Sequence, residues 1–173
     1  MCALSVAVVS IASAQKFHAD KTGALKGKQL GNQVFLTGAG TVTCTTASTS
    51  GTVTSLLALH QLVEVKYSGC TAFGFIKTHI TPALYLFNAD NGLVQLENGV
   101  LINPLGAGCE VHLAPQHLLG VAFQNTNKKI VEISKVHSIK SQGTGGVCGG
   151  ANTTGTYTGN NQIELEGGTI EWF

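Results

Sequence analysis

Hydrophobic and polar residues alternate with a period of two along much of the chain. In residues 61–67, the apolar side chains of Val63, Val65 and Tyr67 alternate with polar ones, and residues 73–81 repeat this pattern. A period of two is typical of a β-strand that buries one face. The pattern therefore predicts strands in both segments.

Turn signals separate these strands. Asn-Gly at residues 91–92 lies between two apolar runs, residues 83–87 and 93–97, and is the strongest short-range signal for a β-hairpin. Residues 48–51 are rich in Ser and Gly and predict another turn. Residues 130–139 carry Ile and Val at mixed spacing, which suits a bent strand or a hairpin arm.

About a dozen short strands follow one another at spacings of roughly 8–12 residues. No helical stripe longer than two turns interrupts them. This spacing predicts an all-β fold, an antiparallel two-sheet sandwich of the jelly-roll type. A closed β-barrel is the alternative.

The first fourteen residues have the features of a secretory signal. Residues 3–11 are apolar, and Ala12-Ser13-Ala14 fits the small-x-small cleavage rule, so we expect residues 1–14 to be a signal remnant and residues 15–173 to be one domain. No basic residue precedes the apolar run, so we expect the true start to lie upstream or the chain to be clipped; a buried N-terminal strand is the alternative. Neither this run nor any later stretch is long enough to span a membrane.

Without the signal, four cysteines remain: Cys44, Cys70, Cys109 and Cys148. An even number in an exported chain implies disulfides. Four cysteines allow three connectivities, and we favour Cys44–Cys70 with Cys109–Cys148 because each bridge closes a local segment. No CxxC spacing supports a zinc site instead.

Composition limits the partners. Charged residues make up only 11% of the chain, the formal net charge is +1 and arginine is absent. Arginine is the preferred residue for bidentate phosphate and guanine contacts, so we expect no nucleic-acid partner. The polar surface must come from Thr, Ser, Asn, Gln and Gly.

The sequence contains no motif that predicts catalysis, a cofactor or a metal site. There is no Gly-x-Ser-x-Gly elbow, and the two aspartates, Asp20 and Asp90, sit in turn-like surroundings. Seven glutamates could supply a catalytic pair, but Glu132, like Glu64 and Glu171, alternates with apolar neighbours, which predicts that it points towards solvent. His112 and His117 near Cys109 make a poor metal site, because a disulfide would consume the cysteine.

Aromatic residues are few and fall mostly in apolar strand positions. Phe73 and Phe75 are among them, which predicts core packing. Tyr67, Tyr85 and Trp172 could form a sugar-stacking platform only if two of them shared an exposed face. We expect these three to pack in the core as well.

Several stretches resemble a group of exported domains. They are residues 42–54, Tyr67-Ser-Gly-Cys-Thr-Ala-Phe-Gly74, the Gly-rich approach to Cys148 and the Gly-Thr-Ile-Glu-Trp ending. Together they resemble uncharacterised exported four-cysteine all-β domains of actinobacterial type. That group carries no assigned activity, so the resemblance implies export and a disulfide-bonded β-fold.

We therefore expect a secreted, non-catalytic binding or structural module at the cell surface, with an extracellular or cell-wall partner that the sequence does not identify. One alternative is a β-barrel that encloses a small apolar ligand, which would require a cavity of several hundred Å3. The other is an extracellular hydrolase, which would require two carboxylates or a Ser–His pair to converge in a cleft.

Overall fold

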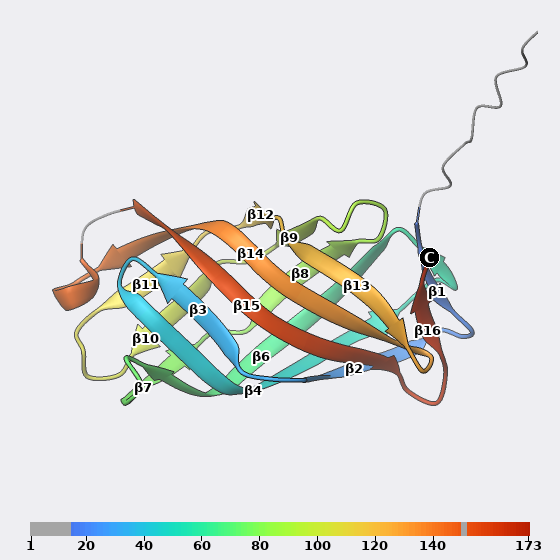
Figure 1. The fold of residues 1–173 in the computed structure, drawn as a ribbon, viewed down its shortest axis with the longest axis horizontal. Coiled ribbons are helices and arrows are strands. Elements are labelled where there is room, and N and C mark those ends of the chain that lie inside the picture. The colour runs from blue at the N-terminus through green and yellow to red at the C-terminus, as the bar shows by residue number, and fades with distance from the viewer. Residues whose placement is uncertain (1–14, 150–151) are drawn as a thin grey trace, which may run out of the picture.

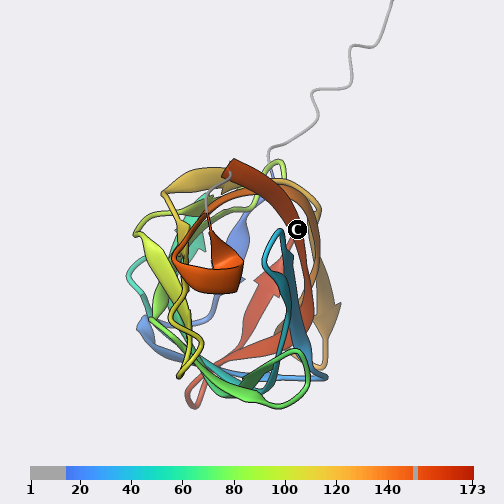
Figure 2. The same cartoon turned by 90° about the vertical axis from the view of Figure 1, so that its left-hand side faces the viewer.

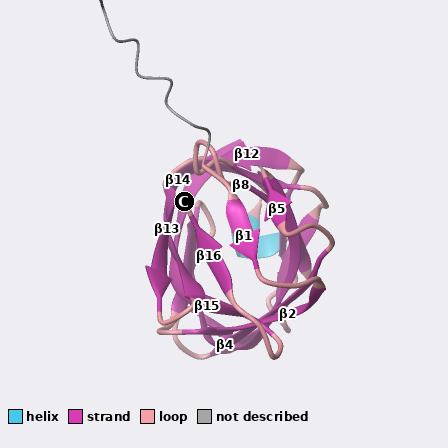
Figure 3. Cartoon of the chain, turned by 90° about the vertical axis from the view of Figure 1, so that its right-hand side faces the viewer, coloured by secondary structure: helices cyan, strands magenta, loops and turns pink. Residues whose placement is uncertain are grey.

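The chain folds almost entirely into β-strands. The structure is a computed structural model that describes residues 15–149 and 152–173. Across these ranges it contains sixteen strands and one short 3-10 helix (Figure 3). All strand pairings are antiparallel. The predicted all-β antiparallel fold is confirmed, and the expected signal remnant, residues 1–14, lies outside the described residues.

Four long strands run along most of the molecule (Figure 1): β4 (Gly40–Val53), β6 (His60–Ala72), β14 (Lys129–Thr144) and β15 (Asn152–Leu165). The shorter elements are β1 (Phe17–Ala19), β2 (Gly23–Gln29), β3 (Gln33–Thr37), β5 (Leu57–Ala58), β7 (Ile76–Ile80), β8 (Ala83–Asn88), β9 (Val94–Leu96), β10 (Val100–Pro104), β11 (Glu110–Leu113), β12 (Gln116–Leu118), β13 (Val121–Thr126), η1 (Gly146–Cys148) and β16 (Ile170–Trp172).

The body is sandwich-like. β4 pairs with β6, and β14 pairs with β15. The pairings continue from β6 through β7, β10 and β11 to β14, and from β15 through β3 back to β4, so the two faces are hydrogen-bonded to each other at their edges. β6 also pairs with β8, which leads to β9 and β12. The sheet therefore forks beside β6.

The long strands bend instead of ending in turns. β4 continues through residues 48–51, where Ser50 pairs with Glu64 of β6, so the turn predicted there is wrong. In β14 the register with β15 shifts between Val136 and Ile139, which makes it the bent strand that the sequence suggests. A bulge of this kind bends a strand without ending it. In β6, Gly69 has a φ of +60°, and a Cβ atom there would overlap the Thr45 hydroxyl, while the register with β4 is the same on both sides of it.

Amide side chains complete the pairing where strands part. Asn98 accepts a bond from the Leu84 N–H (2.7 Å) and donates one to the Pro82 carbonyl (2.8 Å). Gln116 does the same with the N–H and C=O of Lys140 (2.8 and 2.9 Å). Asn125 bonds both backbone groups of Trp172 (2.7 and 2.8 Å). Each amide supplies one donor and one acceptor, as a neighbouring strand would.

The two ends of the molecule are closed differently (Figures 1 and 2). At one end, η1 lies within the ring of strands, next to the β3–β4 hairpin and the β10–β11 turn. At the other end, β1 pairs with β16 and β5 in a separate three-stranded sheet. Phe17 and Ile170 from this small sheet are buried in the core.

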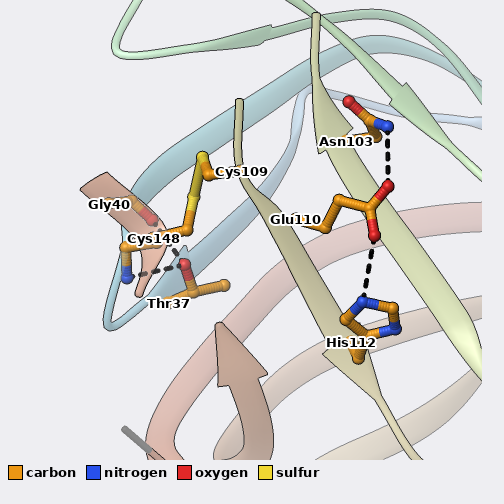
Figure 4. The surroundings of a disulfide bond; sticks show 8 residues. Thr37, Gly40, Asn103, Cys109, Glu110, His112 and Cys148 are labelled. Carbon is orange, nitrogen blue, oxygen red and sulfur yellow. Dashed lines mark hydrogen bonds and ion pairs between the residues drawn. A yellow bond between two sulfur atoms is a disulfide. The ribbon is translucent and has the colours of Figure 1, made fainter. Parts of the chain in front are cut away.

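The core is one apolar cluster stapled by two disulfides. Cys44 bonds Cys70 across the β4–β6 pair, and Cys109 bonds Cys148, which ties the start of β11 to η1 (Figure 4). This is the connectivity favoured from the sequence. All four cysteines are buried.

Two aromatic residues depart from the predicted strand. Phe73 and Phe75 belong to the β6–β7 turn, and β7 begins only at Ile76. Phe73 has a φ of +53°, and its side chain is 44% exposed, while that of Phe75 is 78% exposed. The prediction of core packing is wrong for both residues, because the turn takes them out of the alternation.

The disulfides should contribute to the free energy of unfolding. The bridges close segments with sequence separations of 26 and 39 residues. We predict that replacing Cys44 and Cys70 together by alanine lowers the free energy of unfolding by about 3–4 kcal/mol, because the unfolded chain regains loop entropy. Urea unfolding of the oxidised proteins measures this change.

Tryptic mapping without reduction checks the connectivity. The four cysteines fall in four different tryptic peptides, residues 29–66, 67–77, 78–128 and 141–173. The structure predicts that 29–66 stays linked to 67–77. A linked pair of 29–66 and 141–173 would contradict it.

Candidate functional site: a buried carboxyl cluster and an outer groove

A polar cluster lies in the middle of the core. Tyr67, Tyr85 and Tyr157, the only tyrosines in the chain, enter it from β6, β8 and β15, and Glu132 enters it from β14. The Glu132 side chain is shielded, with a residue exposure of 3%. Burying a carboxyl is costly unless it is hydrogen-bonded.

Hydrogen bonds hold the cluster together. Glu132 accepts one bond from the Ser134 hydroxyl and one of 2.6 Å from the Asn161 amide. The Tyr67 and Tyr85 hydroxyls bond each other at 3.0 Å. The Tyr157 hydroxyl donates to Oε1 of the Gln33 side-chain amide, and β3 thereby contributes Gln33 to the same cluster. The buried polar groups thus bond one another across strands that are far apart in sequence.

No cation offsets the Glu132 carboxyl: none of the ion pairs between described residues includes it. Desolvation raises the pKa of Glu132, while its hydrogen bonds to Ser134 and Asn161 act in the opposite direction. Burial also raises the pKa of Tyr67 and Tyr157 well above the usual tyrosine value, and it raises that of Tyr85 to about 12. The cluster therefore favours uncharged side chains.

The space inside the cluster is small. A cavity of about 20 Å3 lies between Tyr85, Glu132 and Tyr157. A single water needs roughly 10–15 Å3 of such volume, whereas small-molecule sites span roughly 300–1,000 Å3. This cavity has room for one water and not for an organic ligand.

The larger hollow is on the outside of the molecule. An open groove of about 1020 Å3 crosses the outer side of the sheet at the fork, from β6 and β8 over β10 and β11 to β14 and β15. Leu84 and Leu101, which are partly exposed, supply apolar surface, and hydroxyl and amide side chains supply polar contacts. The charged or titratable residues of the lining are Glu64, His112 and Lys140.

Next to the groove, three side chains of β10 and β11 form a hydrogen-bonded row (Figure 4). The Asn103 amide donates to Glu110 Oε1, and Glu110 Oε2 lies 3.2 Å from His112 Nε2. A carboxylate that orients an imidazole is one half of a nucleophile-activating arrangement. The Ser141 hydroxyl does not belong to this row, because its hydrogen-bond partner is Thr153 Oγ1 at 3.0 Å.

Glu132 is buried, although the sequence pattern predicted that it faces solvent. Its prediction as a solvent-facing residue is wrong, because the inward face of β14 carries Ile130, Glu132, Ser134 and Val136. The period-two relation to Ile130 and Val136 was the available signal. The expected solvent-facing positions of Glu64 and Glu171 agree with their partial exposure, and Tyr67 and Tyr85 pack in the core as expected, so they form no exposed sugar platform.

The remaining candidate residues either form turns or lie too far from one another to make a site. Within residues 15–149 and 152–173, no three His, Cys, Asp or Glu side chains gather as metal ligands, and His112 and His117 lie on separate strands. The Asn91–Gly92 turn joins β8 and β9, which pair as the predicted hairpin. There the Asn88 and Asn91 side chains accept bonds from the N–H groups of Asp90 and Leu93.

Comparisons with protein-family models, characterised proteins and solved structures gave no match. Among the described residues, no helix has the length and apolar character needed to cross a bilayer. The two disulfides indicate an oxidising environment outside the cytosol.

The tyrosine cluster leads to a spectroscopic prediction. When the pH rises one unit above the ordinary tyrosine pKa of about 10, the folded protein should show almost no tyrosinate absorbance, because burial disfavours the charged phenolate. The same chain unfolded in urea should titrate near the ordinary value. Tyrosinate absorbance of the folded protein near that value would contradict the buried cluster.

Glu132 leads to a pH prediction for stability. Because its pKa is raised from 4.5 on folding, its contribution to the free energy of unfolding is complete below pH 4.5 and is lost as the pH rises through the folded pKa. The slope in that window reaches up to about 1.4 kcal/mol per pH unit. We expect Glu132→Gln to remove this slope in urea unfolding measured over a pH series.

A carboxyl outside the core is the matched control. Glu97→Gln should keep the slope of the unsubstituted protein. Asp20 and Glu164, whose pKa values are lowered by hydrogen bonds to Thr169 and Lys129, are present in every variant and cancel from the comparison. An unchanged slope in Glu132→Gln would show that Glu132 does not titrate differently on folding.

Proposed function

We propose that this protein is an exported, non-catalytic binding module that holds an extended partner in the outer groove. The observation that carries this proposal is the contrast between the groove of about 1020 Å3 and an interior cavity of about 20 Å3. A partner can reach the groove without any rearrangement of the core. Export is supported by the two disulfides and by the resemblance to exported actinobacterial domains.

The groove lining suits a weakly charged, extended partner. In the described chain, the side chains of Gln142, Asn152 and Thr154 form no hydrogen bonds, so their polar groups remain available to a ligand. The neighbouring leucines can cover apolar parts of the same ligand. Sites that combine apolar surface with a few convergent polar groups are typical of ligand recognition.

The lining favours a polypeptide over a sugar. No Phe, Tyr or Trp belongs to the groove lining formed by the described residues. Sugar recognition commonly uses an aromatic face, and this groove offers aliphatic side chains and amides instead. An extended peptide can use both, with its backbone hydrogen-bonded to amides and its side chains on Leu84 and Leu101.

The groove supports binding better than hydrolysis. His112 is hydrogen-bonded to Glu110, and the Ser141 hydroxyl is bonded to Thr153, so the nucleophile and the base are engaged with different partners. Acyl transfer needs the nucleophile within hydrogen-bond reach of its base. A separate assay of the purified protein on esters, peptides and glycosides tests for turnover.

We predict that a library of displayed random linear peptides yields sequences that bind the protein through this groove. Gln142→Arg should weaken that binding by about tenfold or more, since it places a bulky charge in the groove. Equilibrium binding of the selected peptides to the purified variants measures the effect. Ser48→Arg is the matched control, because Ser48 is an exposed strand residue of β4 outside the groove.

Two results would contradict the proposal. Peptides that bind equally to Gln142→Arg would locate the interaction elsewhere on the molecule. Failure of the peptide selection together with binding to a polysaccharide panel would assign the groove to a different class of partner.

A further inference from the structure

One end of the molecule carries no charge. We define the apolar end as the described residues of four strand connections, 37–40, 72–76, 104–109 and 144–149, which lie together around η1 (Figure 2). None of these residues is Asp, Glu, Lys, Arg or His. They are mostly Gly, Ala and larger apolar residues.

Three large apolar side chains of the apolar end are open to solvent. Phe73 is 44% exposed, Phe75 is 78% exposed and Leu105 is 56% exposed. The turns that carry them are neighbours, because the Leu105 N–H bonds the Lys77 carbonyl at 2.8 Å. An exposed apolar group rimmed by polar residues is typical of an interaction site.

The connections at the opposite end of the molecule carry charged residues, although Leu56, Leu57 and Phe173 are exposed there too. The charged residues are Asp20, Lys21, Asp90, Lys128 and Glu166. The charge-free surface is therefore confined to one end, even though the chain as a whole has few charges.

We propose that the apolar end docks on a lipid bilayer, with Phe75 and Leu105 entering the interface between headgroups and acyl chains. The Phe73 ring packs against Gly40, which fixes the β6–β7 turn on the β3–β4 hairpin. This surface is separate from the groove, so the inference goes beyond the proposed function and does not depend on it.

Backbone hydrogen bonding permits this insertion. Moving a backbone N–H or C=O group into an apolar medium without a hydrogen-bond partner is strongly unfavourable in free energy. This cost normally keeps loops out of bilayers. Here the N–H groups of Phe73, Phe75 and Leu105 already donate to Thr41, Ala72 and Lys77. The three side chains can leave water while these donors stay satisfied.

The shape of the apolar end favours lipid over a second copy of the chain. The cavity beneath it is about 10 Å3, too small to receive a side chain. The open depression beside the β10–β11 turn is lined by Pro104, Cys109, Thr144, Asn103, Glu110 and glycines. Its apolar members Pro104 and Cys109 are buried, so it gives little apolar surface to Phe75 of another copy. A fluid lipid surface needs no matching hollow.

Charge also fits a bilayer. The charged residues directly behind the turns of the apolar end are Lys77, which is exposed, and Glu110, whose side chain is 42% exposed. At headgroup depth the Lys77 ammonium group can contact lipid phosphates while its aliphatic stem stays near the apolar side chains. With one cation and one anion behind the apolar end, binding should depend mainly on apolar contact and only weakly on salt.

Sedimentation with vesicles tests the proposal. We expect the oxidised protein to sediment with phosphatidylcholine vesicles, and Phe75→Ser to lower the partition coefficient on the order of tenfold, with a smaller loss for Leu105→Ser. Lys77→Gln should weaken binding about fivefold on vesicles that contain phosphatidylglycerol, with little effect on phosphatidylcholine alone. Leu57→Ser and Leu119→Ser are matched controls, since these leucines are 50% and 69% exposed outside the apolar end.

The single tryptophan reports the orientation. Trp172 belongs to β16 at the opposite end, so its fluorescence should not change when vesicles bind. Each variant should keep the tyrosine titration of the folded protein, and Gln142→Arg should keep full vesicle binding, which separates this proposal from the groove.

Three outcomes would overturn the proposal. One is failure of the unsubstituted protein to bind either kind of vesicle. Another is full binding by Phe75→Ser combined with Leu105→Ser. The third is a concentration-dependent dimer in ultracentrifugation that Phe75→Ser abolishes while no vesicle binding occurs, because it would show that a second copy covers the apolar end.

Discussion

The backbone of the four long strands needs hydrogen-bond partners along both edges, and the rest of the structure follows from this requirement. A long strand with an open edge exposes unpaired N–H and C=O groups. Shorter strands supply most of the partners, and Asn98, Gln116 and Asn125 bridge positions where those strands part. Asn98 lies beside the fork at β6, and the outer groove crosses the sheet there.

The interior meets a second requirement, because its middle section contains polar side chains. Glu132, Tyr67 and Tyr157 are buried and Tyr85 is partly buried, and each finds a hydrogen bond within the cluster. Filling the interior in this way leaves room for about one water. The two contacts that we propose therefore lie on the outer surface, one in the groove and the other at the apolar end.

Much of the fold could be predicted because it depends on neighbours in sequence. The alternation at Val63, Val65 and Tyr67 identifies β6, and Asn-Gly identifies the β8–β9 hairpin. The disulfide pairing could be inferred from local closure of each segment. Strand length could not, because Ser- and Gly-rich residues resemble a turn in sequence whether they end a strand or continue it, as residues 48–51 do in β4.

The candidate site was largely beyond prediction, since its members meet only through long-range pairing. Glu132 and Asn161 lie on paired strands, and Gln33 reaches them from β3. The groove likewise needs β8, β11 and β15 at one fork. Side-chain alternation is a local property and indicates which residues share a face, whereas the tertiary pairing of distant strands decides whether that face is core, groove or open surface.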